Sequence, residues 1–333
     1  MSDKHIRLAH GNGGRFMREL IEQVFARHLG KAGPDITLDA SPFALPAGVP
    51  MTSVDAFTVQ PLEFPGGDIG TLAVNGTVND LAVSGALPKY LTLSAILEEG
   101  LEIALLDRVV ASLARAALRA EVEVLAGDTK VVPRGHGGGI FFTTTGIGVR
   151  PHDVRLGLEL IRRGDVVMVS GPVGDHGIAV LLARQEFDLH AGIRSDCAPV
   201  IALAQAAMVH GARFMRDPTR GGLASVANEI CSATGLGVRL DEARVPIREE
   251  VRGVCEMLGY DPYYLACEGR IVAVVPASAA DAVLAAWRRT EGGEDAAIIG
   301  TVTDAPARVV LATSAGGERI VGELEEEPLP RIC

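Results

Sequence analysis

Four aspartates stand at positions where the sequence predicts strand ends or glycine-rich turns: Asp55, Asp80, Asp128 and Asp217. Carboxylates from several such positions suit a hard cation, because Mg²⁺ takes oxygen ligands while it bridges a substrate phosphate. Each aspartate taken alone could instead have a local structural role, because aspartates favour turns and helix caps, where the side chain accepts hydrogen bonds from nearby backbone amides. Together the four residues form a candidate magnesium and phosphate site.

Two further ionisable residues could act beside such a site. Lys130 closes the segment Gly127-Asp-Thr-Lys130, where its charge could neutralise phosphate oxygens. Glu268 lies in Leu265-Ala-Cys-Glu-Gly269, between a predicted helix and a predicted strand, where burial would suit a general base. An ordinary surface lysine and a solvent-facing glutamate are the alternatives, and spacing does not choose between them.

Glycine-rich segments offer backbone amides to anions at two places. Gly11, Asn12, Gly13 and Gly14 form a loop that leads into a predicted helix, and Arg220-Gly-Gly222 begins another. Free N–H groups at a helix start bind phosphates, although glycine also serves linkers and close packing. The chain contains neither a Walker loop nor a dinucleotide fingerprint, so a nucleotide would be bound by another arrangement.

The five cysteines are odd in number and include no C-x-x-C pair, which excludes a disulfide framework or a zinc-site spacing. Cys197, Cys231 and Cys255 fall in apolar, helix-like patterns and are predicted to be buried. Cys333 is the last residue and follows an acidic, proline-containing segment. That segment, 323–333, is predicted to be an extended tail that could carry Cys333, or else a disordered solubilising tail.

These residues must be positioned by alternating strands and helices, which predicts an α+β fold. In the first half we expect helices over 15–29 and 101–120 and strands over 51–59, 89–97, 122–125 and 140–149. In the second half we expect helices over 177–186, 198–210, 222–233 and 279–289, and strands over 166–170, 238–241, 270–275, 297–303 and 308–312. The resulting division is 1–35 for the loop and helix, 36–150 and 151–322 for two domains, and 323–333 for the tail.

Composition narrows the class of protein. The 333 residues are 48% hydrophobic and only 4% aromatic, which is typical of a chain with enough aliphatic side chains for two domain cores. A net charge of −11 argues against a nucleic-acid partner. No uncharged stretch is long enough to cross a bilayer, and the first residues lack the apolar run of a signal peptide, so we expect a cytoplasmic protein without a membrane partner.

Eight short blocks follow one another along the chain: Leu8-Ala-His-Gly-Asn-Gly-Gly14, Phe64-Pro-Gly-Gly-Asp-Ile-Gly70, Asn79-Asp-Leu-Ala-Val-Ser-Gly-Ala86, Ile96-Leu-Glu-Glu-Gly-Leu101, Ala126-Gly-Asp-Thr-Lys-Val-Val132, Ser170-Gly-Pro-Val-Gly-Asp-His-Gly177, Arg216-Asp-Pro-Thr-Arg-Gly-Gly222 and Pro330-Arg-Ile-Cys333. In this order they resemble the HypE family of hydrogenase maturation factors, a branch of the aminoimidazole ribonucleotide synthetase-like ATP-binding superfamily. The resemblance runs from His10 to Cys333, and the terminal block is the most specific.

The resemblance implies an N-terminal α/β domain that builds a homodimer through a sheet or barrel, a C-terminal α+β domain, a flexible tail, and ATP with Mg²⁺ at the interface. It implies that the carbamoyltransferase HypF loads a carbamoyl group on Cys333, that the chain dehydrates this group to a thiocyanate with ATP, and that the cyanide passes to iron on the HypC–HypD scaffold for [NiFe] hydrogenase. By position it implies catalytic roles for Cys333, Glu268 and Lys130. The nucleotide would contact Gly11, Asn12, Gly13, Gly14, Asn79, Thr129, Lys130, Arg220, Gly221 and Gly222, and the metal Asp55, Asp80, Asp128 and Asp217.

One departure from the family pattern concerns the residue before Glu268, where Cys267 stands in place of the usual asparagine. Two other functions remain open from the residues alone. The chain could be a related ATP-dependent synthetase or kinase, of the selenophosphate synthetase or thiamine-phosphate kinase type, with an incidental terminal cysteine. It could also be a scaffold that uses Cys333 to deliver a metal without catalysis.

Overall fold

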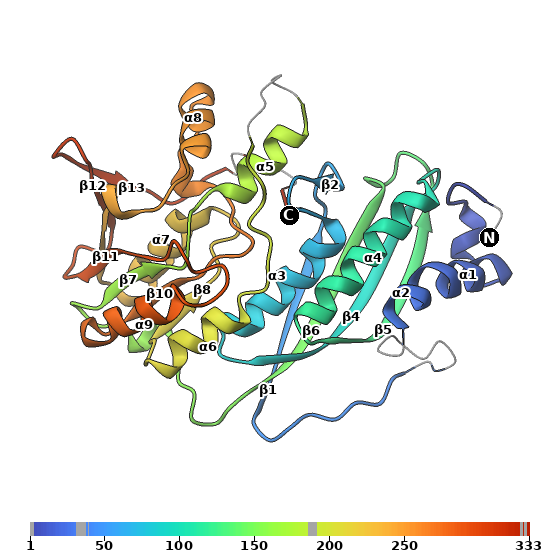
Figure 1. The fold of residues 1–333 in the computed structure, drawn as a ribbon, viewed down its shortest axis with the longest axis horizontal. Coiled ribbons are helices and arrows are strands. Elements are labelled where there is room, and N and C mark those ends of the chain that lie inside the picture. Colours follow the sequence, from blue (N-terminus) through green and yellow to red (C-terminus); the bar gives the residue numbers. More distant parts are fainter. Residues whose placement is uncertain (1–2, 31–37, 39, 186–191, 327–328, 330–331) are drawn as a thin grey trace. The chain divides into compact units, whose positions relative to one another are not determined.

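The computed structural model describes residues 3–30, 38, 40–185, 192–326, 329 and 332–333 (Figure 1). The chain divides into two compact units. Unit 1 comprises residues 1–81, 86–151 and 331–333, and unit 2 comprises residues 82–85 and 152–330. Among the described residues, no helix combines the length and the apolar character that a membrane span requires.

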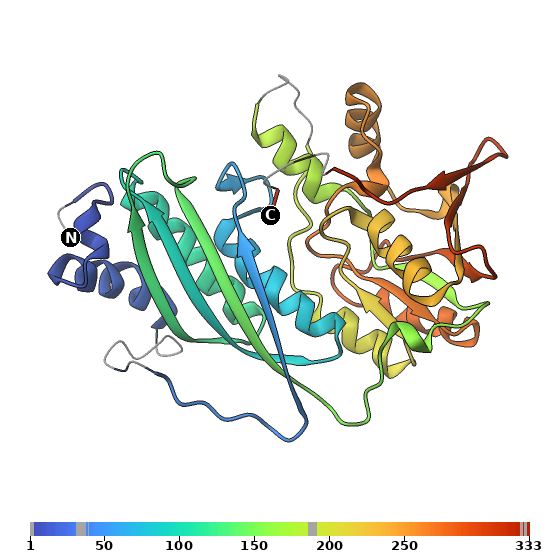
Figure 2. The same cartoon turned by 180° about the vertical axis from the view of Figure 1, so that it is seen from behind.

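Unit 1 is built on a four-stranded sheet in the order β1-β6-β4-β5. Its strands are β1 (Val49–Phe57), β6 (Ile140–Arg150), β4 (Leu87–Glu98) and β5 (Glu123–Val132). Helices α3 (Ile69–Val83) and α4 (Ile103–Arg119) lie over one face of this sheet, whereas Figure 2 shows the opposite face with no described helix of unit 1 over it. The β4–β5 pair is parallel and is connected through α4, and the other pairs are antiparallel.

The sequence pattern predicts one of the two helices on this sheet and not the other. Helix α4 has the amphipathic spacing that predicts it, and Leu106, Val110 and Leu113 are buried. Helix α3 was not predicted, because it has no polar face: even Asn75 and Thr77 are at most 2% exposed. A helix that is buried all round lacks the amphipathic period that the sequence reading used.

The N-terminal segment is helical, as the sequence predicts. It runs through η1 (Leu8–Gly11), α1 (Arg15–Leu20), one π-helical turn over Ile21–Ala26 and α2 (Arg27–Leu29). A short hairpin of β2 (Glu63–Phe64) and β3 (Gly67–Asp68) precedes α3. The predicted strand over 122–125 is too short, because β5 continues to Val132 by pairing with residues 90–98 of β4.

Unit 2 is built on a seven-stranded sheet in the order β13-β12-β9-β11-β7-β10-β8. Its strands are β7 (Val166–Val169), β8 (Phe214–Arg216), β9 (Gly237–Asp241), β10 (Val272–Val275), β11 (Ala297–Thr303), β12 (Val309–Ala312) and β13 (Glu318–Val321). Its helices are α5 (Asp175–Ala183), α6 (Ile201–Val209), α7 (Gly222–Thr234), α8 (Glu249–Leu258) and α9 (Ala280–Trp287), with short turns at η4 (Leu158–Leu160), η5 (Glu242–Arg244), η6 (Pro262–Tyr264) and η7 (Ala277–Ala279). The sequence predicts most of these elements and misses α8, β8 and β13.

The central strands of unit 2 are buried on both faces. One core cluster joins Val167 and Val272 to α7, and the other joins Met168 and Ala273 to α6 and α9. The single tryptophan, Trp287, is fully buried in the second cluster, where its indole N–H donates to the Leu203 carbonyl at 2.9 Å. Because such strands carry apolar residues at every position, they read as continuous apolar runs.

Candidate functional site

Two of the predicted metal ligands lie where β1 packs against α3 in unit 1. The Thr77 hydroxyl donates to Asp55 Oδ2 at 2.8 Å, and the Ser53 hydroxyl donates to Asp80 Oδ2 at 2.5 Å. Asp80 therefore lies inside a helix, not at a strand end or in a glycine-rich turn as the sequence reading expected. The two carboxylates reach the same strand–helix contact because Ser53 and Asp55 are two residues apart on one strand, and Thr77 and Asp80 three apart on one helix.

The Gly127–Lys130 segment lies within strand β5 and does not follow it. Asp128 and Lys130 point to the exposed side, with Lys130 Nζ 3.5 Å from Asp128 Oδ2, whereas Thr129 is only 5% exposed and faces the interior. A strand alternates its faces in this way. Thr129 is therefore separated from the surface that carries the two charged residues, and so is Asn79, which is 1% exposed within α3.

The N-terminal glycine loop lies beside this strand. A Cβ at Gly11 would stand 2.8 Å from the Val131 amide nitrogen, so only glycine allows the loop to approach β5 this closely. Gly13 has a φ of +75° and has open space around its Cα, as has Gly14. The structure thus places residues 11–14 next to the strand that carries Asp128 and Lys130.

The end of the chain also lies in unit 1. The Thr58 amide and hydroxyl both donate to the Cys333 carbonyl, at 3.3 and 3.4 Å, directly after β1. Ile332 is 2% exposed, and Cys333 is half-buried. The last two residues are therefore packed against the protein, which differs from a terminus without contacts.

The other predicted site residues belong to unit 2 and meet at the start of α7. Asp217 directly follows β8, a strand that the sequence did not predict, and is 7% exposed. Gly222 has a φ of +58°, and a Cβ there would stand 2.5 Å from the Leu265 carbonyl oxygen. The Cys267 amide donates to the Pro218 carbonyl at 2.9 Å. The helix start that contains Arg220 and Gly221 is therefore adjacent to the segment that carries Glu268.

Glu268 is buried, at 2% exposure, which decides between the two alternatives that the sequence left open. Its neighbour Cys267 is also buried, and its sulfur accepts a hydrogen bond from the Gly174 amide at 3.3 Å. Burial raises the pKa of the Cys267 thiol, the nearby Asp196 raises it further, and the Gly174 N–H opposes the shift. The thiol is thus neutral in the interior, where it also donates to the Leu265 carbonyl at 3.8 Å.

A buried ionic network beneath Glu268 was missed by the sequence reading. Asp196 and Asp175, both with side chains at most 3% exposed, flank Arg270 at 3.4 and 3.7 Å, and Arg248 Nε donates to Asp175 at 2.9 Å. Burial raises the pKa of Asp175 to about 6 despite the hydrogen bond from Arg248. The block Ser170–Gly177 contains Asp175, but Asp196 carries no local pattern that could have singled it out.

In the part of the chain that the structure describes, no three histidine, cysteine or acidic side chains are gathered closely enough to hold a metal ion alone. Three of the predicted ligands belong to unit 1, and Asp217 belongs to unit 2. Asp55 and Asp80 nevertheless fit Mg²⁺, because this cation is usually bound by one or two carboxylates together with waters and substrate phosphates. The Ser53 hydroxyl that contacts Asp80 is neutral, which leaves the charge of Asp80 available to a cation.

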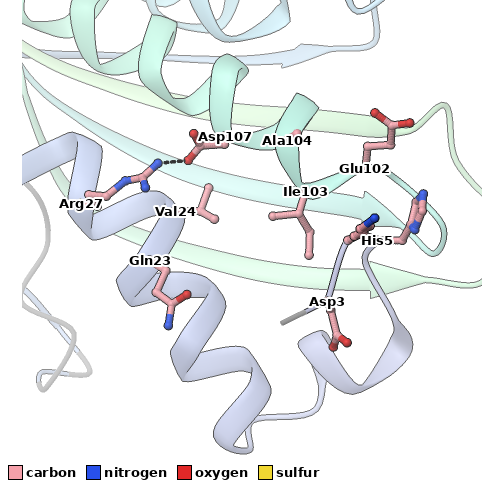
Figure 3. Close-up of a pocket in the computed structure, with 10 residues that line it drawn as sticks. Asp3, His5, Gln23, Val24, Arg27, Glu102, Ile103, Ala104 and Asp107 are labelled. Carbon is pink, nitrogen blue, oxygen red and sulfur yellow. Dashed lines mark hydrogen bonds and ion pairs between the residues drawn. The ribbon is translucent and has the colours of Figure 1, made fainter. Parts of the chain in front are cut away.

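A cavity of about 500 Å³ lies elsewhere in unit 1, between the N-terminal segment and the start of α4. Figure 3 shows Arg27 and Asp107 directed at one another within it, and Asp107 also contacts His28 at 2.9 Å. None of the predicted site residues lines this cavity. The cavity is therefore not part of the candidate site.

Comparisons with known proteins agree with this arrangement. Residues 45–150 match the N-terminal domain of the AIR synthase related proteins, and residues 162–312 match their C-terminal domain. The chain therefore belongs to the AIR synthase related proteins. Within them it belongs to the HypE family: it is 46% identical over 331 residues to the carbamoyl dehydratase HypE of Azotobacter vinelandii, covering 98% of this chain and 97% of that protein.

Solved structures show the same relationship. A hydrogenase maturation protein HypE in complex with ATP superposes with a TM-score of 0.93 at 43% identity, over 98% of this chain and 99% of that one. A chain of a HypE–HypF complex superposes with a TM-score of 0.80 at 40% identity, over 93% of this chain and 100% of that one. Thiamine monophosphate kinase of Aquifex aeolicus, with a TM-score of 0.62 at 20% identity over 94% of this chain and 99% of that one, shares the fold alone.

Proposed function

We propose that this protein is an ATP-dependent carbamoyl dehydratase that acts on its own terminal residue and converts S-carbamoylated Cys333 to a thiocyanate. The observation that carries the proposal is the placement of Cys333: this last residue is half-buried, and its backbone carbonyl accepts a hydrogen bond from Thr58. The chain that carries it is 46% identical to a carbamoyl dehydratase. The thiocyanate would supply the cyanide ligand for assembly of the [NiFe] hydrogenase iron centre.

The reaction needs a leaving group and a base. The carbamoyl oxygen leaves poorly, so transfer of the γ-phosphoryl group of ATP to this oxygen prepares it to depart as phosphate. Removal of both protons from the carbamoyl nitrogen then leaves the C≡N bond on the Cys333 sulfur, with ADP and phosphate as the other products. Glu268 is proposed as the base, because its carboxylate lies in the interior, at 2% exposure, in the segment that adjoins the helix start at residues 220–222.

Other residues of the proposal bind and orient the nucleotide. Lys130 would neutralise developing charge, and the amides of residues 11–14 and 220–222 would contact phosphates. Asp55 and Asp80, with Asp128 and Asp217 as further candidates, would hold Mg²⁺, which when bound stabilises charge on the phosphoryl oxygens. Asn79 and Thr129 are buried in unit 1, and we propose that they position the neighbouring nucleotide-binding residues and do not touch the nucleotide directly.

The partners follow from the same relationship. HypF is proposed as the transferase that loads Cys333, because a chain similar to this one forms a complex with HypF, and the HypC–HypD scaffold is proposed as the acceptor of the cyanide. Five free thiols are typical of a reducing compartment, and for this reason we place the protein in the cytoplasm.

A homodimer through unit 1 is also proposed, supported by the uncovered face of its sheet (Figure 2). Val54, which is 62% exposed, pairs in register with Thr145, and Phe141 and Ile147 lie on the same face of the neighbouring strand. Apolar residues on an open sheet face are typical of an interface. Sedimentation of wild type and of Val54→Glu tests this: wild type should be dimeric and the variant monomeric, and a monomeric wild type would overturn the dimer.

Intact-mass spectrometry tests the reaction itself. After incubation with the carbamoyltransferase, carbamoyl phosphate and ATP, the chain should gain one carbamoyl group and then lose one water only when it can bind ATP. Cys333→Ser should gain nothing while it still binds ATP, and Cys197→Ala, which removes a buried thiol, should behave as wild type. Thiocyanate formed by Cys333→Ser would exclude this function and favour a reaction on a free acceptor.

A further inference from the structure

The carboxylate of Asp196 holds three consecutive residues of the segment that carries Glu268. Asp196 Oδ1 accepts from the Glu268 amide at 3.1 Å, and Oδ2 accepts from the Gly269 amide at 3.3 Å. Oδ2 also lies 3.4 Å from Arg270 Nε, and the Asp196 side chain is fully buried. Each oxygen therefore holds its own amide, which the single acceptor oxygen of an asparagine could not do.

The position of Asp196 is itself fixed from both sides. Its neighbour Ser195 is 2.8 Å from His176 Nδ1 and accepts from the Cys197 amide at 3.0 Å, so the segment is tied to helix α5. Gly269 packs directly on the Asp196 carbonyl, where a Cβ would overlap that oxygen. The turn can therefore shift little without displacing Asp196 as well.

Arg270 completes the support by linking the turn to the rest of unit 2. Its guanidinium donates to the Pro172 and Gly292 carbonyls at 3.1 and 3.0 Å and lies 3.7 Å from Asp175. A buried ion pair is weak evidence for stability, because removing two charges from water costs about as much as their attraction returns. The network is better explained by what it fixes in place, which is the backbone of Glu268.

We propose that Asp196 is a positioning residue for Glu268, and that the Asp175–His176 end of α5 supports it through Arg270 and Ser195. The inference rests on the proposed function, in which Glu268 takes protons from the carbamoyl nitrogen. Loss of the second amide contact would let the Glu268 backbone move, and a displacement of about 1 Å at a reacting group costs on the order of 10²-fold in rate.

The chain offers a matched control in Asp165. It is also buried, accepts from the Arg162 amide at 2.7 Å and lies 3.4 Å from Arg213 Nε, but it supports the β7 end of the sheet and holds no candidate functional residue. Asp196→Asn and Asp165→Asn therefore remove the same charge from the same kind of environment. Only the first is expected to affect the reaction.

The experiment follows water loss from carbamoylated Cys333 in single turnovers over a range of ATP concentrations, with kcat the rate constant at saturating ATP and KM the ATP concentration that gives half of it. Asp196→Asn should lower kcat by on the order of 10²-fold with an unchanged KM for ATP and unchanged carbamoyl loading, whereas Asp165→Asn should leave kcat unchanged. In a double-mutant cycle, Asp196→Asn should add almost nothing to Glu268→Gln, because both act through one group. Gly269→Ala, which crowds the same turn without removing a charge, should reproduce the loss if Asp196→Asn does not fold.

The opposite results would overturn the inference. Equal kcat for Asp196→Asn, Gly269→Ala and wild type would show that the turn needs no such support. Additive losses in the cycle would show that Asp196 acts independently of Glu268. Absence of water loss in wild type would contradict the proposed function itself and is seen before any variant is made.

Discussion

Two groups of aspartates in this protein are held by different partners. In unit 1, Asp55 and Asp80 accept hydrogen bonds from the hydroxyls of Thr77 and Ser53. In unit 2, Asp175 and Asp196 are buried and contact arginine guanidinium groups. A hydroxyl orients a carboxylate without neutralising its charge, whereas an arginine does both.

This difference in partners suits the two groups of aspartates to different roles, one in ligand binding and one in holding the backbone. Asp80, whose carboxylate is oriented by the Ser53 hydroxyl, keeps its charge for a cation that arrives with a ligand, which suits metal and phosphate binding. A carboxylate that is already paired and buried is suited to fixing the backbone around it. The comparison predicts that variants of the first group lose activity and keep stability, and that variants of the second group lose stability or geometry.

The largest effect is expected for Asp80→Asn. Without this charge, ATP hydrolysis should fall by on the order of 10²–10³-fold, the range found when one group that stabilises transition-state charge is removed. The Ser53 hydroxyl can still donate to the amide oxygen, so the thermal midpoint should change little. Asp107 on α4, whose carboxylate already pairs with Arg27 and His28 of α2, provides the matched control, and Asp107→Asn should retain activity. Hydrolysis at the wild-type rate by Asp80→Asn would break the comparison.

The next effect concerns the stability of unit 2. Arg270→Met leaves Asp175 and Asp196 buried without their shared cation, and loss of one partner of a buried pair costs about 3–5 kcal/mol. Arg248→Met removes a partner of Asp175 that is 45% exposed and should cost about 1 kcal/mol or less. Urea unfolding followed by the fluorescence of Trp287, the single tryptophan, measures both. Equal losses would show that burial of the cation does not matter.

The sequence predicted those parts of the fold that have one apolar face or a continuous apolar run. Helix α4 has the amphipathic period, and β7 and β10 are runs of valine and other apolar residues. Helix α3 was missed because it has no amphipathic period, and β5 was predicted to end at Leu125, although the polar residues that follow are tolerated on an edge strand. As a result, the sequence placed Asp80 and Asp128 at strand ends or in turns, whereas the structure has them inside a helix and a strand.

The candidate site was predictable where a residue type is rare in its context. Glu268 within an apolar segment and a cysteine at the last position are such signals, and burial of Cys197, Cys231 and Cys255 was also predicted correctly. The support for Glu268 was not predictable, because Asp196 is 72 residues away and meets it only through backbone amides. Contacts with backbone atoms leave no pattern of side-chain types to read.

A smaller effect is expected in how the unfolding free energy of unit 2 depends on pH. The pKa of Asp175 is raised from 3.8 to about 6, chiefly by burial, although Arg248 and Arg270 oppose the shift and Asp196 adds to it. The folded state then holds a proton that the unfolded chain has released, so the stability contributed by this proton is complete below pH 4. It is lost as the pH rises through 6, and amounts to about 3 kcal/mol at 1.36 kcal/mol per unit.

Urea unfolding of wild type and Asp175→Asn across this range checks the assignment, again by Trp287 fluorescence. The slope of unfolding free energy against pH between 4 and 6 should be less negative in the variant, whose amide cannot titrate. An identical slope would mean that Asp175 does not take up a proton in this range, and would contradict the assignment.

The smallest effect extends the comparison from carboxylates to thiols. Burial raises the pKa of Cys231 and of Cys255 to about 11, and that of Cys267 is also raised, so at pH 7.5 few of these thiols are ionised. Cys333 is half-buried at the end of the chain. Because the thiolate is the nucleophile, iodoacetamide should label Cys333 first, as peptide mapping would detect. Early labelling of Cys267 would mean that the segment beside Glu268 opens, and that the arginine-paired aspartates do not fix it as the comparison requires.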